Sequence, residues 1–104
     1  MTPRDVEIAI VGGGIWGLSA AYHLARAGHT RIHVLERNAA VATETTPRAA
    51  GLVGQIRSDA TMLGAVQYAL DLLGRFAAET GHEPGLHQTG SLMVALSEER
   101  MAYC

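Results

Sequence analysis

Three consecutive glycines interrupt an apolar segment near the beginning of the chain, where residues 10–29 read IVGGGIWGLSAAYHLARAGH. A glycine inside regular structure costs roughly 0.5–1 kcal/mol relative to alanine, so such a cluster needs a physical reason. The β-branched run 6–11 precedes the glycines and predicts a buried strand, whereas residues 15–27 have apolar positions at helical spacing. The glycines therefore mark a turn from a strand into a helix, with Gly28 as the expected C-terminal cap of that helix.

The elements after this helix predict an α/β fold. Residues 32–35 are a short apolar run that ends at Glu36 and predicts a second strand, parallel to the first because the helix connects them. A long loop rich in Thr, Ala, Gly and Pro follows. Residues 61–79 have an apolar stripe at helical spacing and predict a long helix. Residues 91–96 predict a third strand, and Ser97 is the expected cap of a further helix.

The glycine turn has the spacing G-x-G-x-x-G, formed by Gly12, Gly14 and Gly17. In dinucleotide-binding folds the first glycine permits the tight turn, the second lets a pyrophosphate approach the backbone, and the third lets the helix pack close to the strand. The N–H groups of the first helical turn then face the diphosphate. Glu36 follows about 20 residues later, where a carboxylate accepts hydrogen bonds from ribose hydroxyls and repels the 2′-phosphate of NADP. The pattern predicts dinucleotide binding; the alternative is a β-α-β unit with coincidental glycines.

Three stretches of the chain resemble one family of flavoproteins. The glycine run, closed by Leu35-Glu36-Arg37, resembles the FAD-binding motif of the D-amino-acid oxidase-like superfamily. Residues 43–52, TETTPRAAGL, are similar to the hydroxyl-rich loop and A-A-G-L turn of the sarcosine and dimethylglycine dehydrogenases. Residues 79–101 resemble the segment of those enzymes that leads from a long helix into a strand. The resemblance implies the N-terminal part of a Rossmann-like FAD-binding domain, with a β-α-β unit, a long helix and a further strand.

The resemblance also implies an FAD site along the glycine turn and the hydroxyl-rich loop. Glu36 would lie at the ribose with Arg37 beside it, and the loop would run along the flavin. Without the flanking resemblance, Thr45 and Thr46 would be interpreted as part of a solvated loop. The implied FAD-binding residues are Gly12, Gly14, Ile15, Trp16, Gly17, Glu36, Arg37, Thr45, Thr46, Arg48, Ala49, Ala50, Gly51 and Leu52.

One position departs from the pattern of the family. Members that bind the flavin covalently have a histidine directly before the A-A-G sequence, where this chain has Arg48. A guanidinium is protonated and has no free lone pair with which to attack the flavin. We therefore expect FAD to be bound without a covalent link at this position.

The function implied by the resemblance is FAD-dependent oxidation of a small-molecule amine, an N-methylated amine or amino acid of the sarcosine or dimethylglycine type. In that family the flavin accepts a hydride equivalent from the carbon next to nitrogen, giving an imine that water hydrolyses. The sequence identifies neither the catalytic residues nor the electron acceptor.

Two alternatives to this function remain open. An NAD-dependent dehydrogenase would share the motif from Gly12 to Glu36 but has no use for the hydroxyl-rich loop at 43–52. A non-catalytic fragment that binds only a nucleotide is the other. Because family members are several times longer than 104 residues, we expect residues 1–104 to be an N-terminal segment that is inactive alone, without the substrate domain.

Composition bears on partners and compartment. A net charge of −2 gives no reason to expect nucleic acid or an anionic membrane surface. The single cysteine, Cys104, allows no internal disulfide, which favours a reducing compartment. The first five residues are too few and too polar for a secretory signal, and no apolar run approaches the ~20 residues of a membrane span. The expected location is the cytoplasm. The five histidines have no metal-binding spacing, so we expect no metal site.

Overall fold

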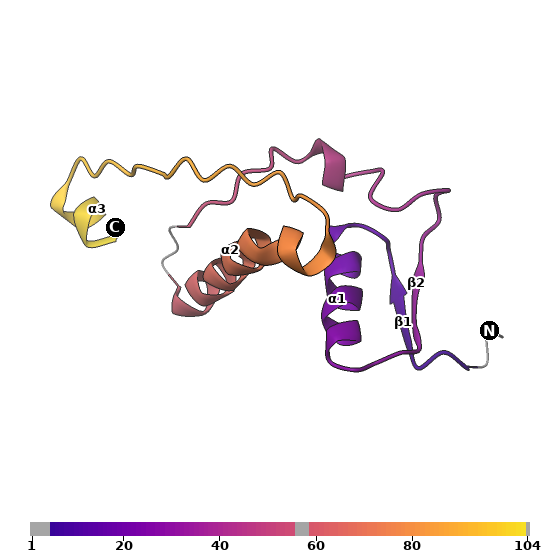
Figure 1. Ribbon diagram of the computed structural model, residues 1–104. Helices are drawn as coiled ribbons and strands as arrows, with labels where there is room; N and C mark the ends of the chain where they lie inside the picture. Colours follow the sequence, from indigo (N-terminus) through magenta and orange to yellow (C-terminus); the bar gives the residue numbers. More distant parts are fainter. Residues whose placement is uncertain (1–4, 56–58, 104) are drawn as a thin grey trace. The chain divides into compact units, whose positions relative to one another are not determined.

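The computed structural model describes residues 5–55 and 59–103. The chain divides into two compact units, Met1–Ala50 and Gly51–Cys104. Figure 1 shows the elements of both units. In chain order these are β1 (Ile8–Val11), α1 (Ile15–Arg26), β2 (Ile32–Leu35), the 3-10 turn η2 (Thr46–Arg48), α2 (Ala60–Thr80) and α3 (Glu98–Tyr103).

The first unit is a β-α-β unit with two parallel strands, as the sequence predicts. Strands β1 and β2 pair in register, with Ile8 opposite Ile32 and Val11 opposite Leu35, and α1 contacts both strands. The helix ends at Arg26, and Gly28 follows with a positive φ of 99°. That left-handed conformation is the one in which glycine terminates a helix without strain. The predicted strand-helix-strand order is confirmed.

Apolar contacts between α1 and the strands are only partly shielded from solvent. The side chains of Ile10, Leu18 and Val34 are half-buried. Among the residues that the structure describes, Gly13 alone is buried, and no hydrophobic side chain is. The most enclosed point of the first unit is therefore the glycine turn between β1 and α1.

The second unit contains the long helix α2, which extends one residue beyond the predicted 61–79 at each end. Its N-cap is Asp59, whose carboxylate accepts a hydrogen bond from the Met62 amide at 2.9 Å. Gly81 ends the helix with φ of 75°. The short helix α3 is capped as expected, because the Ser97 hydroxyl accepts a hydrogen bond from the Arg100 amide at 3.2 Å.

The third strand that the sequence predicts over residues 91–96 is not formed, and this expectation was wrong. The sheet has two strands, β1 and β2, and no other described segment pairs with residues 91–96. A strand needs a neighbour to accept and donate its backbone hydrogen bonds. Leu92 and Leu96 are instead 90% and 91% exposed. Residues 91–96 have the apolar composition typical of a strand, but in the described part of the chain they have no neighbouring strand with which to form backbone hydrogen bonds.

None of the helices in the described ranges has the length and apolar character needed to cross a membrane.

Candidate dinucleotide-binding site

Gly12 and Gly17 of the turn are required by the backbone itself. Gly12 has φ of 104°, a conformation that other residues rarely adopt, and its amide donates a hydrogen bond to the Leu35 carbonyl at 2.8 Å. A Cβ on Gly17 would overlap the Gly12 carbonyl oxygen and lie 3.2 Å from Cγ2 of Ile10. These two glycines therefore allow the tight turn and the close approach of α1 to β1.

Gly14 is different, because the space in front of it is open. It is the N-cap of α1 with an ordinary φ of −78°, and a Cβ there would meet only Oγ1 of Thr46, at 3.4 Å. That distance is ordinary van der Waals contact, so protein packing does not demand a glycine here. A hollow of about 300 Å³ lies in front of Gly14, between the ends of both strands and residues 42–46. The missing side chain keeps this hollow open at the turn.

A second hollow, of about 450 Å³, adjoins the first at the glycine turn. The two share Gly12, Gly14 and Thr46, and the second is also lined by Trp16 and Ala49. Trp16 is 91% exposed, so its ring forms an open wall of this hollow. The turn therefore borders two adjoining hollows, one lined by Glu36 and the other by Trp16.

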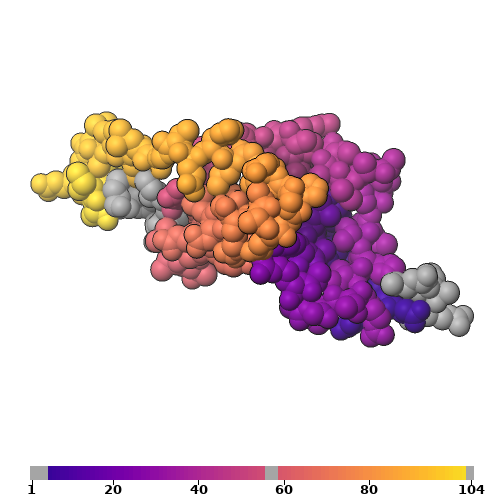
Figure 2. Space-filling view, viewed as in Figure 1, coloured from indigo at the N-terminus to yellow at the C-terminus, as the bar shows by residue number. Residues whose placement is uncertain are grey.

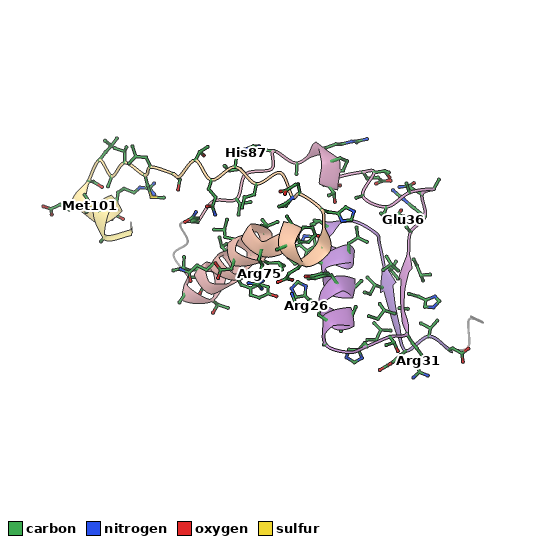
Figure 3. All side chains as sticks on the ribbon, viewed as in Figure 1. Arg26, Arg31, Glu36, Arg75, His87 and Met101 are labelled. Carbon is green, nitrogen blue, oxygen red and sulfur yellow. The ribbon has the colours of Figure 1, made fainter. Side chains whose placement is uncertain are left out.

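Glu36 lies at the carboxyl end of β2, at the opposite end of the strand from Arg31 (Figure 3). Its Oε1 accepts a hydrogen bond from the Asn38 amide, and its Oε2 accepts one from the Gly13 amide, both at 2.9 Å. These two bonds hold the pKa of Glu36 below its ordinary value of 4.5, and the bond from Asn38 has the larger effect. The carboxylate is thus ionised at neutral pH, and its remaining lone pairs can accept hydrogen bonds from hydroxyl groups of a ligand.

A cluster of polar side chains next to Glu36 closes the loop that follows β2. Oε1 of Glu44 accepts hydrogen bonds from Nη2 of Arg37 at 2.6 Å and from Nδ2 of Asn38 at 3.1 Å. The Asn38 amide group and the Arg37 guanidinium lower the pKa of Glu44, and Glu44 raises the pKa of Arg37. The sequence-based site missed Asn38 and Glu44. In the sequence they are only polar residues of a loop, and nothing in the pattern indicates that this loop folds back to bring residue 44 against residues 37 and 38.

Thr46 connects the loop directly to the start of α1. Its Oγ1 accepts a hydrogen bond from the Ile15 amide at 3.1 Å. One of the first-turn N–H groups expected to be free for a diphosphate is therefore already bound to a hydroxyl. That hydroxyl still has its own proton to donate to an anion. Thr45, the residue before it, is exposed at the N-cap of η2.

The remaining residues of the implied site divide between the two units. Arg48, Ala49 and Ala50 are exposed in the first unit, whose residues 37–50 lie mostly on its surface (Figure 2). Gly51 and Leu52 belong to the second unit, where they line a separate hollow of about 290 Å³ together with residues 85–91. Within the first unit, the structure thus brings together the glycine turn, Glu36, Arg37, Thr45, Thr46 and Ala49. Arg48 lines neither hollow, and Gly51 and Leu52 belong to the other unit.

In the described residues, no cluster of three or more His, Cys, Asp or Glu side chains is arranged to hold a metal ion.

A comparison with known families decides the class of protein. Residues 7–104 match the family described as "DAO: FAD dependent oxidoreductase". The chain belongs to this DAO family. The β-α-β unit with its glycine turn and the long helix α2 agree with the N-terminal, FAD-binding part of a DAO-family protein. The expected likeness to the dimethylglycine and sarcosine dehydrogenases is confirmed as well.

Relatives of this DAO-family chain carry several names. It is 38% identical, over 95% of its length, to 4-methylaminobutanoate oxidase (formaldehyde-forming) of Paenarthrobacter nicotinovorans. Mitochondrial dimethylglycine dehydrogenase of Rattus norvegicus is 37% identical over 91% of the chain. The mitochondrial pyruvate dehydrogenase phosphatase regulatory subunit of Mus musculus is 32% identical over 95%. The chain spans 11–12% of the length of these curated relatives.

Proposed function

We propose that residues 1–104 are the N-terminal FAD-binding part of an oxidoreductase that acts on N-methylated amines or amino acids. The observation that carries the FAD proposal is the hollow of about 300 Å³ that Gly14 and Glu36 both line, at a glycine that protein packing alone does not require. The family match favours FAD over the nicotinamide alternative, because both cofactors use the same glycine turn but this family is FAD-dependent.

The residues at the turn fit the adenosine diphosphate half of FAD. Backbone N–H groups at the start of α1 suit phosphate oxygens, and the open space at Gly14 lets those oxygens approach. The Thr46 hydroxyl, already fixed by the Ile15 amide, would donate its proton to a phosphate oxygen. The ionised Glu36 would accept hydrogen bonds from the ribose hydroxyls. Each group binds or orients the cofactor, and none is assigned a step in the chemistry.

The substrate class is proposed from the relatives. When bound, FAD supplies a hydride acceptor for oxidation of the carbon next to an amine nitrogen. The names of two relatives contain a methylamino acid, 4-methylaminobutanoate in one and dimethylglycine in the other. We therefore assign the intact natural protein that contains residues 1–104 to the N-methyl amino acids as a substrate class.

The test combines cofactor identification with substrate reduction. The intact protein is purified, its bound cofactor is released and identified, and flavin bleaching is followed anaerobically with dimethylglycine, sarcosine and 4-methylaminobutanoate. Glycine and 4-aminobutanoate are the matched controls without N-methyl groups. We expect FAD and faster bleaching by the methylated compounds. Recovery of NAD, or equal rates with both sets, would contradict the proposal. The Gly14→Val variant should contain no flavin, because a branched side chain occupies the space of the diphosphate.

We also propose that FAD is held without a covalent bond at Arg48. The guanidinium has no free lone pair, but it can donate charge-assisted hydrogen bonds to the cofactor. Acid precipitation of the intact holoprotein should leave the yellow colour in the supernatant. A coloured pellet with a flavin-bearing peptide from residues 43–52 would show that this interpretation of Arg48 is wrong.

A regulatory, non-catalytic protein is the second candidate, because one relative is named as a regulatory subunit. The same bleaching experiment separates the two candidates. A protein that binds FAD, yet is not reduced by any amine in the panel, would support this second function over the first.

A further inference from the structure

Gly13 does not belong to the G-x-G-x-x-G motif, yet it alone among the described residues is buried. Its backbone is bound on both sides. The Gly13 amide donates a hydrogen bond to Oε2 of Glu36 at 2.9 Å, and the Gly13 carbonyl accepts one from the Ala42 amide, also at 2.9 Å. One peptide segment thus joins the glycine turn to the end of β2 and to the loop beyond it.

A side chain at Gly13 would meet both of these neighbours. An ideal Cβ would lie 2.9 Å from Cγ1 of Val41 and 3.1 Å from Oε2 of Glu36. The first distance is too short for a real contact between side chains, so Val41 would have to move. The second is tighter than an ordinary contact, so the Glu36 carboxylate would have to shift by a few tenths of an ångström. The absence of a side chain at Gly13 therefore allows both contacts to form at once.

The loop adopts an unusual backbone conformation at this contact. Ala42 has φ of 56°, and it is the one non-glycine residue with positive φ in the described part of the chain. Such a conformation persists only where the surrounding structure holds it in place. Here the hydrogen bond from Ala42 to Gly13 and the packing of Val41 over Gly13 do so. Four residues later the same loop places the Thr46 hydroxyl on the Ile15 amide.

We infer that Gly13 is a positioning residue for the ligand: it aims the Glu36 carboxylate and seats the loop at Val41 and Ala42 against the glycine turn. The middle glycine of the run is thus required by the loop that covers it. The Gly12 and Gly17 positions, by contrast, are set by the backbone of the turn itself. For its effect on the cofactor, this inference rests on the proposed binding of FAD.

The test is a double-mutant cycle in the intact protein, with FAD affinity as the readout. Gly13→Ala should weaken FAD binding by at least about tenfold, the loss expected when one hydrogen bond to a charged group is displaced. Val41→Ala alone should weaken FAD binding less than Gly13→Ala, because Val41 is half exposed and the hydrogen bond from Ala42 to Gly13 remains. The combination of both changes should recover part of the loss, because the added methyl group then has space.

A second readout separates positioning from general weakening of the fold. FAD is compared with an analogue that lacks the 2′- and 3′-hydroxyls of the adenosine ribose. If Gly13 acts through Glu36, Gly13→Ala should weaken the binding of FAD more than the binding of the analogue. Glu36→Gln should likewise weaken FAD binding more than binding of the analogue. An equal loss for both ligands would overturn the inference.

Ala42→Pro tests the seating of the loop if Gly13→Ala does not fold. Proline has no N–H to donate to the Gly13 carbonyl, and it cannot adopt a positive φ. It should lower FAD affinity while Glu36 and all glycines stay in place. Unchanged affinity in Ala42→Pro, or in a folded Gly13→Ala, would overturn the inference while leaving the proposed function intact. If the unmodified protein does not bind FAD, the proposed function itself fails.

Discussion

Two glycines of the turn, Gly14 and Gly17, look equivalent in the sequence but are required for different physical reasons. Gly17 faces the backbone of Gly12, so an added carbon has no space within the protein. Gly14 faces a hollow, so an added carbon is tolerated by the protein and excluded only by a ligand. An added methyl group should therefore mainly lower stability at position 17 and mainly lower cofactor affinity at position 14.

This contrast gives a matched pair of variants. Gly17→Ala should lower the free energy of unfolding of the intact apoprotein by roughly 1–3 kcal/mol, the usual cost of overpacking. Gly14→Ala should cost less, about 0.5–1 kcal/mol, because alanine is a poorer N-cap than glycine but meets no backbone atom here, and it should weaken FAD binding. Urea unfolding without cofactor and FAD titration measure the two quantities. Similar losses of stability in both variants would contradict the assignment of Gly14 to the ligand.

Glu36 predicts the direction of a pH effect. Because its pKa is lowered in the folded protein, the carboxylate contributes stability above its ordinary pKa of 4.5. That contribution is lost as the pH falls through the lowered value. The difference in free energy of unfolding between the wild type and Glu36→Gln should therefore be constant near neutral pH and shrink on acidification. Urea unfolding from neutral pH to about pH 3 measures it. A difference that grows toward acid pH would show that the sign is wrong.

The candidate site residues that the sequence could place are those whose position depends on local backbone. Gly12 and Gly17 follow from a turn between a strand and a helix, and Glu36 from the end of a strand. Asn38 and Glu44 could not be predicted, because their contact depends on how residues 37–46 fold back. The importance of Gly13 was hidden for the same reason, since its neighbour Val41 lies far along the chain.

At the scale of secondary structure, α1 and α2 were predicted nearly to their ends because glycines follow both helices and apolar residues repeat along them. The cap Asp59 was missed, because an acidic residue before a helix is also typical of an ordinary loop. The strand predicted over residues 91–96 was wrong. Composition can indicate that a segment is suited to a sheet, but pairing depends on a neighbouring strand that composition does not supply.

The cap of α2 makes a local prediction. Asp59→Ala removes the acceptor of the Met62 amide and should cost about 1 kcal/mol of helix stability. Native-state hydrogen exchange should show roughly fivefold faster exchange of the Met62 amide. Asp71→Ala, in the middle of the same helix and exposed, is the control that should not accelerate this exchange. Equal effects of the two substitutions would contradict the capping role.

At the scale of the whole molecule, no hydrophobic side chain is buried in the described ranges. Burial of apolar surface is the main favourable contribution to folding, at roughly 25 cal/mol per Å². A polypeptide limited to residues 1–104 should therefore unfold without a sharp transition and bind a hydrophobic dye, while a longer protein that covers these surfaces should not. Thermal unfolding followed by circular dichroism measures this. A steep two-state transition in the 104-residue polypeptide would refute the expectation.

The exposed indole of Trp16 has an optical consequence. It is the single tryptophan among the 104 residues, and it borders the hollow that begins at the glycine turn. Indole emission overlaps the near-ultraviolet absorption of a flavin, so a cofactor bound there should accept excitation energy from this ring. The contribution of Trp16 is the difference in fluorescence between the wild type and the Trp16→Phe variant. This difference should be large in the apoprotein and small in the holoprotein. Residue 16 would then report cofactor occupancy continuously, from within the site and without any added label.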